Sequence, residues 1–253
     1  MHVEENWTRI KNHRNRFNDL EIQGMAEALY QGQEDWLAEK LRLREDGVLA
    51  LEFLGCLGKS GSAKAIAVLI QYLEGGDKAL QAAAAEALKS CPSILVLEPL
   101  VQIMSRQWQG SIKAGEVLLR LGREGTDALW QLWFGHNKPA SLKAQLLQLL
   151  SEVRDQRAVS LAFLAFLSDD EELIREALRA AEKLEAKELW GNVSGCLRHP
   201  SWRLRGKAVQ ILGRWGEVRA LAYLHDMGAD ADPWVEEERQ KAMALLKERK
   251  TEI

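Results

Sequence analysis

Small and apolar residues recur along the chain with two nested periods. The longer period is 31 residues, and it brings six pairs into phase: Cys56-Leu57, Ala87-Leu88, Leu118-Leu119, Leu149-Leu150, Ala180-Ala181 and Ile211-Leu212. Within each copy, further small or apolar residues lie four before and three after the second member of the pair. These offsets follow one face of a 3.6-residue helix. The pattern therefore predicts six copies of an amphipathic helix.

Each predicted helix is followed by a short segment and a second apolar stripe. Five or six residues rich in Gly, Ser or charge come first, as in 58–62 and 213–217. The second stripes again have helical spacing: Ile66, Leu69, Ile70 and Leu73; Leu97, Leu100, Val101 and Met104; Val159, Ala162, Phe163 and Phe166. Each copy thus predicts helix, turn, helix, without strands. Because one pair of this length cannot bury its apolar face alone, neighbouring copies must stack.

Two segments resemble a known repeat. Residues 200–216, PSWRLRGKAVQILGRWG, resemble a HEAT repeat, most closely the short bacterial form called the phycobilisome-lyase-type HEAT-like repeat, and residues 169–184, DDEELIREALRAAEKL, are similar. The resemblance covers about 47–232 clearly. It implies an all-α fold, a right-handed α-solenoid, and it is specific for fold but uninformative about function.

The pattern at the two ends predicts caps. We expect one domain over 1–253, with a polar segment at 1–18, a divergent helix pair at 19–46, six repeats at 47–232 and a capping helix at 233–253. Asp232-Pro233 would begin that helix, and its acidic first turns and basic last turns follow the order that the helix dipole favours. A hydrophobic content of 47% is sufficient for a continuous core.

Such repeats often carry a basic residue early in the first helix that can pair with an acid of the neighbouring turn. In strict register this position holds Ala50, Gln81, Ile112, Lys143, Ile174 and Arg205. Only Lys143 and Arg205 fit. We therefore expect apolar contact, rather than a continuous charge ladder, to hold the repeats together.

Composition narrows the class of partner. The net charge of −3 combines 34 basic with 37 acidic residues, so nothing global favours nucleic acid or an anionic membrane. The chain has no apolar run of membrane-spanning length, and its N-terminus is polar, which predicts a cytoplasmic protein without a membrane partner; that it is bacterial is implied only by the resemblance to the short bacterial repeat. Cys56, Cys91 and Cys196 are scattered, which favours buried thiols over a disulfide or a metal site.

Catalytic signatures are absent from the sequence. It has no phosphate-binding Gly-rich loop, no nucleophile elbow and no paired-Cys spacing, and no two of its five histidines lie three or four residues apart. We expect neither a cofactor nor a metal. The favoured function is a non-enzymatic scaffold or adaptor that binds a protein or peptide on the concave second-helix surface.

The candidate binding residues lie on second helices at positions outside the core stripe, or just beyond it. They are Gln71, Gln102, Arg106, Trp108, Asp127, Trp130, Gln131, Trp190, Asn192, Arg198 and Tyr223. Trp108, Trp130, Trp133 and Trp190 belong to second helices or their ends, where exposed aromatic rings would make good anchors. Trp215 lies on a core stripe and is expected to be buried. Asp127 is also well placed to begin a helix, which is the simpler explanation of that residue.

Two enzymatic alternatives stay open. Certain bacterial DNA glycosylases built from HEAT-like repeats place an acid and tryptophans in a concave groove, as Asp127 and Trp130 would. Their basic groove would have to come from Arg198, Arg203, Arg205, Lys207, Arg214 and Arg219, with Glu217 as the one acid among them; a solvated face is the more economical account, so nucleic acid is a possible but not favoured partner. Phycobilin lyases use HEAT-like stacks to hold a linear tetrapyrrole, for which Trp190, Tyr223 and His225 are the best candidates.

Overall fold

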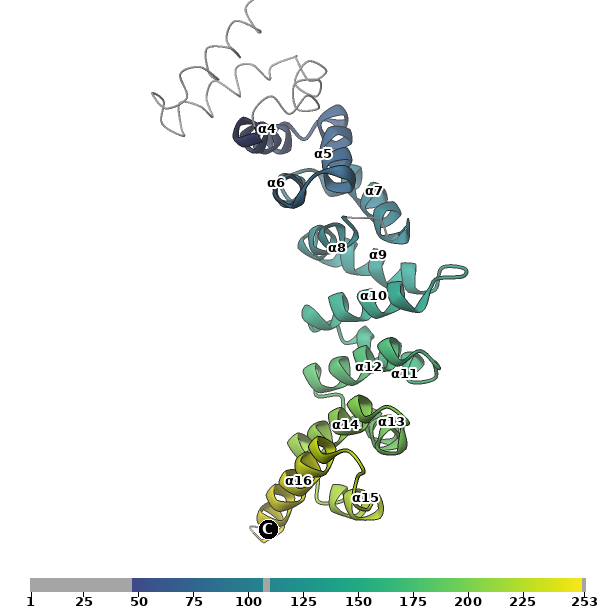
Figure 1. The fold of residues 1–253 in the computed structure, drawn as a ribbon. Helices are drawn as coiled ribbons and strands as arrows, with labels where there is room; N and C mark the ends of the chain where they lie inside the picture. Colours follow the sequence, from purple (N-terminus) through teal and green to yellow (C-terminus); the bar gives the residue numbers. More distant parts are fainter. Residues whose placement is uncertain (1–46, 107–109, 252–253) are drawn as a thin grey trace, which may run out of the picture. The chain divides into compact units, whose positions relative to one another are not determined.

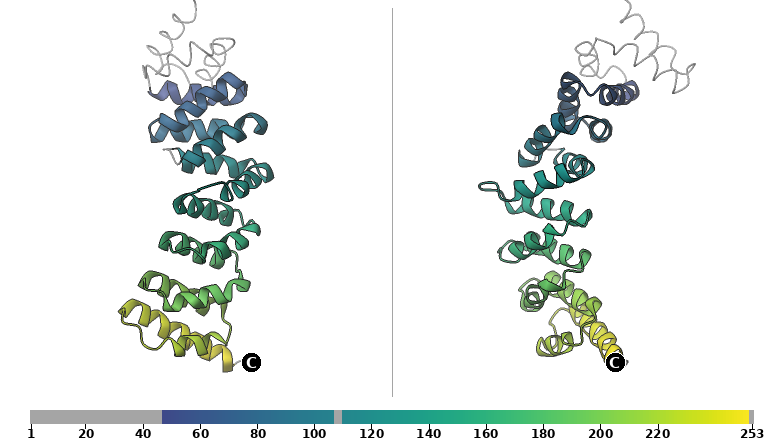
Figure 2. Two further views of the ribbon diagram at one scale, coloured as in Figure 1. Left: turned by 90° about the vertical axis from the view of Figure 1, so that its right-hand side faces the viewer. Right: turned by 180° about the vertical axis from the view of Figure 1, so that it is seen from behind.

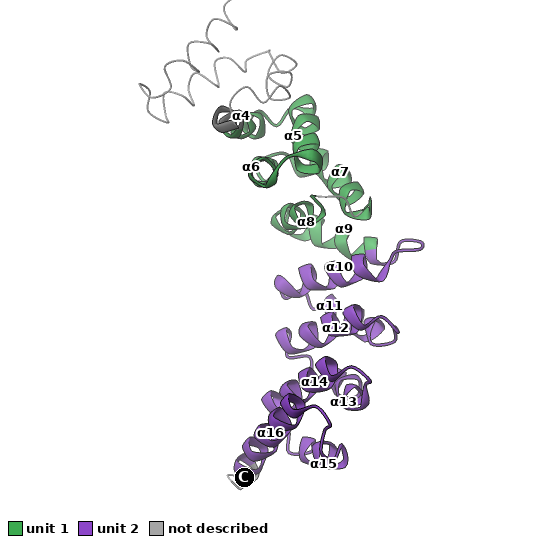
Figure 3. Ribbon diagram, in the orientation of Figure 1, with its two compact units in different colours: residues 1–132 green, residues 133–253 purple. Residues whose placement is uncertain are grey.

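The computed structural model describes residues 47–106 and 110–251, and all regular structure in these two ranges is helical (Figure 1). The predicted pair at 19–46 and the candidate Trp108 lie outside the described residues. The chain divides into two compact units, residues 1–132 and 133–253 (Figure 3). The assignment of 1–253 to a single domain stays a prediction.

The described part of the first unit contains three helix pairs. In chain order its helices are α4 (Gly47–Ser60), α5 (Ala63–Gly75), α6 (Lys78–Leu88), α7 (Ser93–Arg106), α8 (Ser111–Arg120) and α9 (Arg123–Trp133), whose last residue belongs to the second unit. Helix α4 packs against α5 and α6, and α7 packs against α5 and α8. First and second helices form separate rows, as Figure 1 shows.

The second unit continues the same alternation. Its elements are α10 (Ala140–Glu152), α11 (Arg157–Ala165), α12 (Glu171–Lys183), η2 (Lys187–Leu189), α13 (Trp190–Gly195), η3 (Cys196–Arg198), α14 (Trp202–Trp215), α15 (Ala220–Asp226) and α16 (Pro233–Thr251). The first helices α10, α12 and α14 pack in succession, and α16 closes the row against α14. Figure 2 shows these pairs as successive layers. The predicted all-α stack of helix pairs is thereby confirmed.

The core follows the predicted register. Leu57, Leu88, Leu118, Leu150, Ala181 and Leu212 are fully buried. The one departure among the described members of the pairs is Leu119, which is partly exposed because Leu118 takes the core position in α8. Trp215 is buried as expected, and the thiols of Cys91 and Cys196 are buried and free. The side chain of Cys56 lies outside the described residues.

The turns inside the pairs are shorter than predicted. The first helices run on to Ser60 and Trp215, so only two to four residues separate the helices of a pair, not five or six. Gly216 makes one such turn possible, since its left-handed φ of 69° ends α14 while its N–H bonds to Leu212 O. At Gly125 a side chain would lie 1.8 Å from Leu118 O, so α8 and α9 pack closely there.

Ion pairs supplement apolar contact in the first-helix row of the second unit. Lys183 pairs with Glu152 at 2.5 Å, which joins α12 to α10, and Lys207 pairs with Glu182 at 2.5 Å, which joins α14 to α12. Of the two basic register residues, Arg205 does pair with an acid of a neighbouring loop, whereas Lys143 lies over the ring of Trp133. Individual ion pairs thus add to the apolar contact that the sequence predicted as the main cohesion of the repeats.

The C-terminal helix begins where the sequence predicted. Asp232 Oδ1 accepts hydrogen bonds from the N–H groups of Trp234 and Val235, at 3.0 and 3.2 Å, and Pro233 is the first helical residue. Val235 and Leu246 are fully buried against the preceding helices. Helix α16 thus covers the end of the second unit's first-helix row.

Candidate functional site

The described candidate site residues fall on second helices of both units, or, for Arg198, on the short element η3 that follows α13. Gln71, Gln102, Arg106, Gln131, Arg198 and Tyr223 are exposed; Asp127, Trp130 and Asn192 are partly exposed; Trp190 is buried. Those from Gln71 to Gln131 belong to the first unit, and those from Trp190 to Tyr223 belong to the second. Their part in binding stays a prediction.

Asp127 does not begin its helix. Helix α9 starts at Arg123, four residues earlier, and the Asp127 carboxylate lies 3.8 Å from Nε of Arg123. The expectation of an N-terminal Asp127 is therefore wrong, since the Gly122 turn lets the helix start sooner. Leu129, Leu132 and Trp133 occupy the buried face of α9, so the ring of Trp133 is not the exposed anchor that the sequence predicted.

Trp190 is a packing residue and not the exposed aromatic that the sequence predicted. It is 6% exposed, and its ring centroid lies 6.1 Å from those of Trp215 and Tyr223. The guanidinium of Arg219 covers the ring at 4.0 Å. Burial follows from its position at the start of α13, against α14. The buried indole N–H groups of Trp190 and Trp215 have no acceptor in the described part of the chain.

The basic stretch from Arg198 to Arg219 is largely neutralised. Its ion pairs join Arg198 to Asp226, Arg205 to Asp230, Lys207 and Arg214 to Glu182, and Arg219 to Glu217. Arg203 lies over the ring of Trp202, at 5.2 Å from its centroid. Apart from Glu217, these acids lie outside the basic stretch, so the local sequence did not reveal them. A phosphate-binding groove would require this charge to be available.

One cleft of the second unit was not predicted from the sequence. A cleft of about 360 Å³ elsewhere is polar, whereas one of about 680 Å³ is lined by Trp133, Phe134, Gly135, Lys138, Ala140, Lys143, Leu164, Leu167, Ser168 and Leu173. We call the latter the Trp133–Leu173 cleft. Trp133 and Leu173 are buried, while Phe134, Leu164 and Leu167 are 57%, 41% and 67% exposed. Exposed apolar groups gathered at a concavity are typical of binding sites.

The register of α11 explains why this cleft was missed. The predicted stripe placed Phe163 in the core, but α11 buries Ala158, Leu161, Ala162 and Ala165, and Phe163 is 47% exposed. The correct stripe has the same helical spacing and lies one residue earlier, where the three alanines allow close packing. This alternative stripe was the feature of the sequence from which the exposed residues at the end of α11 could have been predicted.

Two lysines line the Trp133–Leu173 cleft, and no acid does. The Lys143 ammonium lies 5.7 Å from the centroid of the Trp133 ring, a cation–π geometry. Neither Lys138 nor Lys143 forms an ion pair within the described ranges. Next to Ser168, the Asp170 carboxylate accepts the Leu173 N–H at 2.8 Å and so begins α12. The lining therefore combines apolar side chains with two positive charges and the hydroxyl of Ser168.

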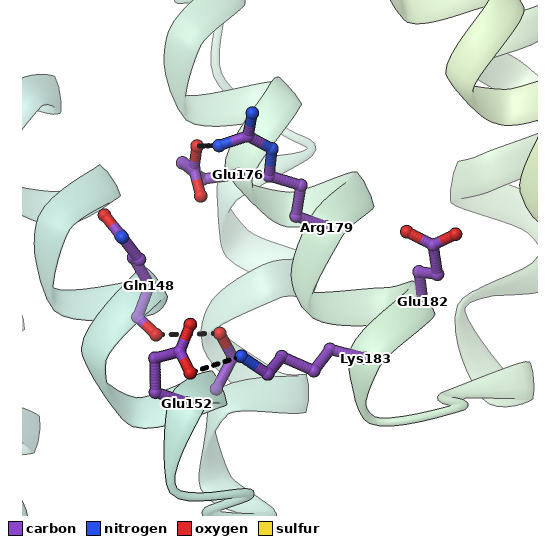
Figure 4. Close-up of a pocket in the computed structure, with 7 residues that line it drawn as sticks. Gln148, Glu152, Glu176, Arg179, Glu182 and Lys183 are labelled. Carbon is purple, nitrogen blue, oxygen red and sulfur yellow. Dashed lines mark hydrogen bonds and ion pairs between the residues drawn. The ribbon is translucent and has the colours of Figure 1, made fainter.

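The polar pocket lies between α10 and α12, on the first-helix row (Figure 4). Glu176 is 5% exposed, and burial raises the pKa of its carboxyl, while Arg179 donates to it at 2.7 Å. Lys183 pairs with Glu152 across the pocket. These charges pair with one another, which is the arrangement expected of a contact that joins two repeats.

Two further features bear on chemistry. Within the described residues, no group of three or more His, Cys, Asp or Glu side chains could hold a metal ion. None of the helices described is both long and apolar enough to cross a membrane.

Comparisons with known proteins identify the repeat. The family described as HEAT repeats matches residues 160–245, so this segment is composed of HEAT repeats and the predicted resemblance is confirmed there. No curated protein matches the chain. The matched segment lies within the second unit, which also holds the Trp133–Leu173 cleft.

Solved structures of similar arrangement share little sequence with the chain. An archaeal HEAT-like repeats protein from Thermococcus onnurineus NA1 is 13% identical, with a TM-score of 0.47 and coverage of 85% of this chain and 97% of that one. Human deoxyhypusine hydroxylase is 17% identical, with a TM-score of 0.40 and coverage of 89% and 88%. The CpcE–CpcF complex of phycocyanin lyase from Nostoc sp. PCC7120 is 18% identical, with a TM-score of 0.37 and coverage of 85% and 94%. At these scores the likenesses carry no functional information.

Proposed function

We propose that the chain is a non-enzymatic binding module that holds a protein or peptide, with the Trp133–Leu173 cleft as a principal contact. One observation carries the proposal: Phe134, Leu164 and Leu167 remain 57%, 41% and 67% exposed around a cleft of about 680 Å³. Large apolar side chains that stay in water around a concavity are stabilised when a partner covers them. Repeat stacks commonly work through such extended surfaces.

The arrangement of the cleft suits an anchor side chain. Trp133 and Leu173 are buried and fixed by their helices, so the floor is formed before a partner arrives. Pre-formed apolar pockets of roughly 300–1,000 Å³ accept large side chains or small ligands, and buried anchors supply much of the binding energy of an interface. The exposed Tyr223 and Gln131 remain candidates for further contacts along the second helices.

The test compares two substitutions of equal exposure. Leu167 and Ile112 are each 67% exposed, but only Leu167 lines the cleft. Proteins captured from a cell extract by the wild type, by Leu167→Ser and by Ile112→Ser would be quantified, and each differential protein would be purified and its affinity measured directly. We expect at least one protein to bind Leu167→Ser about tenfold more weakly, an affinity change of about 1.4 kcal/mol. If every captured protein bound the wild type, Leu167→Ser and Ile112→Ser with equal affinity, the proposed role of the cleft would be overturned.

A further inference from the structure

The charge lining the Trp133–Leu173 cleft indicates what kind of segment it would accept. Lys138 and Lys143 contribute two ammonium groups to a lining that also holds the Ser168 hydroxyl and several apolar side chains. In the described part of the chain neither lysine forms an ion pair with a carboxylate, and the Lys143 ammonium lies over the ring of Trp133. A group that enters between the apolar floor and these ammonium groups gains most if it is itself part apolar and part anionic.

The start of α10 adds to this positive potential. Pro139 occupies the N-cap position and has no side-chain acceptor for the first-turn N–H groups, and Ala140 and Lys143 of that turn line the cleft. The N-terminal end of a helix dipole favours an anion. The dipole and both ammonium groups therefore act on the same side of the cleft, at residues 138–143.

The opposite side of the cleft limits the amount of negative charge that fits. Ser168 and Leu173 line it, and the intervening Asp169, Asp170, Glu171 and Glu172 are all exposed acids. A nucleic acid or an anionic bilayer would place many negative charges against these four carboxylates, at a Coulombic penalty. A single carboxylate beside residues 138–143 avoids that repulsion.

We infer that the Trp133–Leu173 cleft binds a peptide segment in which a Leu, Met or Phe side chain stands beside one Asp or Glu. The apolar side chain lies on Trp133 and Leu173, under Leu164 and Leu167. The adjacent carboxylate pairs with Lys138 and Lys143. This inference rests on the proposed function and adds the chemistry of the partner to it.

A selection from a random peptide display library tests the inference with the full chain as bait. The most enriched peptide would be synthesised with a fluorophore, and a second version would carry the amide in place of its carboxylate. Affinities of both would be measured by fluorescence polarisation for the wild type and for three variants: Lys138→Glu with Lys143→Glu, Leu167→Ser, and the control Lys187→Glu with Lys247→Glu. The control changes net charge equally at two exposed lysines outside the cleft lining.

The expected result is an enriched motif with an acid next to a large apolar residue. Its affinity should fall about tenfold or more in the Lys138/Lys143 variant and with the amide peptide, and by about twofold or less in the Lys187/Lys247 control. A different result would overturn the inference and leave the proposed function standing: peptides that bind Leu167→Ser weakly, but whose affinity is unchanged by the amide and by the charge reversal at Lys138 and Lys143. Peptides that bind Leu167→Ser as well as the wild type, or a selection without enrichment, would overturn the inference outright; the proposed function is then decided by its own affinity comparison.

A melting curve of each variant shows whether it is folded, so that a loss of affinity is not mistaken for unfolding. Lys138 and Lys143 are only partly buried, so their substitution should leave the fold intact. A further variant, Lys138→Gln with Lys143→Gln, keeps polar, hydrogen-bonding side chains, somewhat shorter than lysine, and removes the charge without reversing it. It should weaken the acidic peptide and leave the amide peptide unchanged; equal loss for both peptides would contradict the role assigned to the ammonium groups.

Discussion

Arg205 of α14 and Asp230 of the loop before α16 form a two-point ion pair. Nε lies 2.7 Å from Oδ2, and Nη2 lies 2.8 Å from Oδ1, with the side chains 17% and 5% exposed. Arg205 also donates to the carbonyls of His199 and Pro200 at 3.0 and 2.8 Å. One guanidinium thus connects the loop before α14, the helix itself and the loop that leads into the C-terminal cap.

We expect Asp230→Asn to destabilise the second unit by about 2–3 kcal/mol, because it leaves a largely buried guanidinium without its counter-charge. Asp226→Asn is the matched control, since the Arg198–Asp226 pair is exposed, 76% and 72%, and should change stability by about 0.5 kcal/mol or less. Urea unfolding of both variants measures the difference. Equal destabilisation would contradict the assignment of the Arg205–Asp230 pair as the stronger one.

Stability at acid pH should depend on Glu236. The Arg239 guanidinium, the backbone N–H of Asp230 and Gln240 hold the pKa of Glu236 at about 2, well below its usual 4.5. A lowered pKa means that this carboxylate stabilises the fold above its unfolded pKa, and that the contribution is lost as pH falls from about 4.5 to about 2. Melting temperatures of the wild type and Glu236→Gln should therefore differ most near neutral pH and converge below about pH 3. A constant difference from pH 7 to pH 2 would refute this linkage.

The buried register can be tested at Leu150, which is fully buried in α10. Leu150→Asp should unfold the second unit, since an unpaired buried carboxylate costs several kcal/mol, roughly 4 or more here. Leu167→Asp introduces the same group at a position that is 67% exposed and should shift the melting temperature little. Circular dichroism melts distinguish the two. A folded Leu150→Asp variant with an unchanged melting temperature would show that the register is wrong.

The contribution of the Trp190 ring to stability can be measured separately from that of its indole N–H. Because this indole N–H is buried without an acceptor in the described part of the chain, Trp190→Phe loses no hydrogen bond and should cost about 1 kcal/mol or less. Trp190→Ala removes the ring that packs against Trp215 and Arg219 and should cost about 3–5 kcal/mol. Chemical denaturation compares the two variants. If Phe proved as damaging as Ala, the N–H would have an unrecognised partner.

The glycosylase alternative makes a different prediction for Asp127. As a surface residue of α9 that pairs with Arg123, Asp127 should tolerate replacement by Ala with a change in stability of about 0.5 kcal/mol or less. We expect neither the wild type nor Asp127→Ala to release alkylated bases from methylated duplex DNA. Base release by the wild type that is lost in Asp127→Ala would favour the enzyme over the binding module.

Much of the fold was predictable from local patterns in the sequence. The 31-residue register placed Leu57, Leu88, Leu150 and Leu212 in the core, because a fixed period and a 3.6-residue helix leave only one face for them. The start of α16 at Asp232-Pro233 was also predictable, since an acceptor and a fixed φ suffice to begin a helix. Such features depend on neighbours in the sequence.

The candidate site was less predictable. Trp190 shares the aromatic character of an exposed anchor, but the ring of Trp215 and the guanidinium of Arg219 cover it. Phe163 fits one helical stripe as well as Leu161 fits another, and only packing of α11 against its neighbours chose between them. The acids that neutralise Arg205 and Lys207 lie 25 residues away in either direction along the chain.

The sequence by itself determined the class of fold, the succession of helix pairs and the residues of the repeated core, because local periodicity and capping decide these. The tertiary structure decided which side chains remain in water. It placed Phe134 and Leu167 beside Lys138 and Lys143 in one cleft, and it paired the basic stretch with distant acids. The physical reason is that exposure and charge pairing are set by groups from other helices, whose approach depends on how each repeat packs against the next.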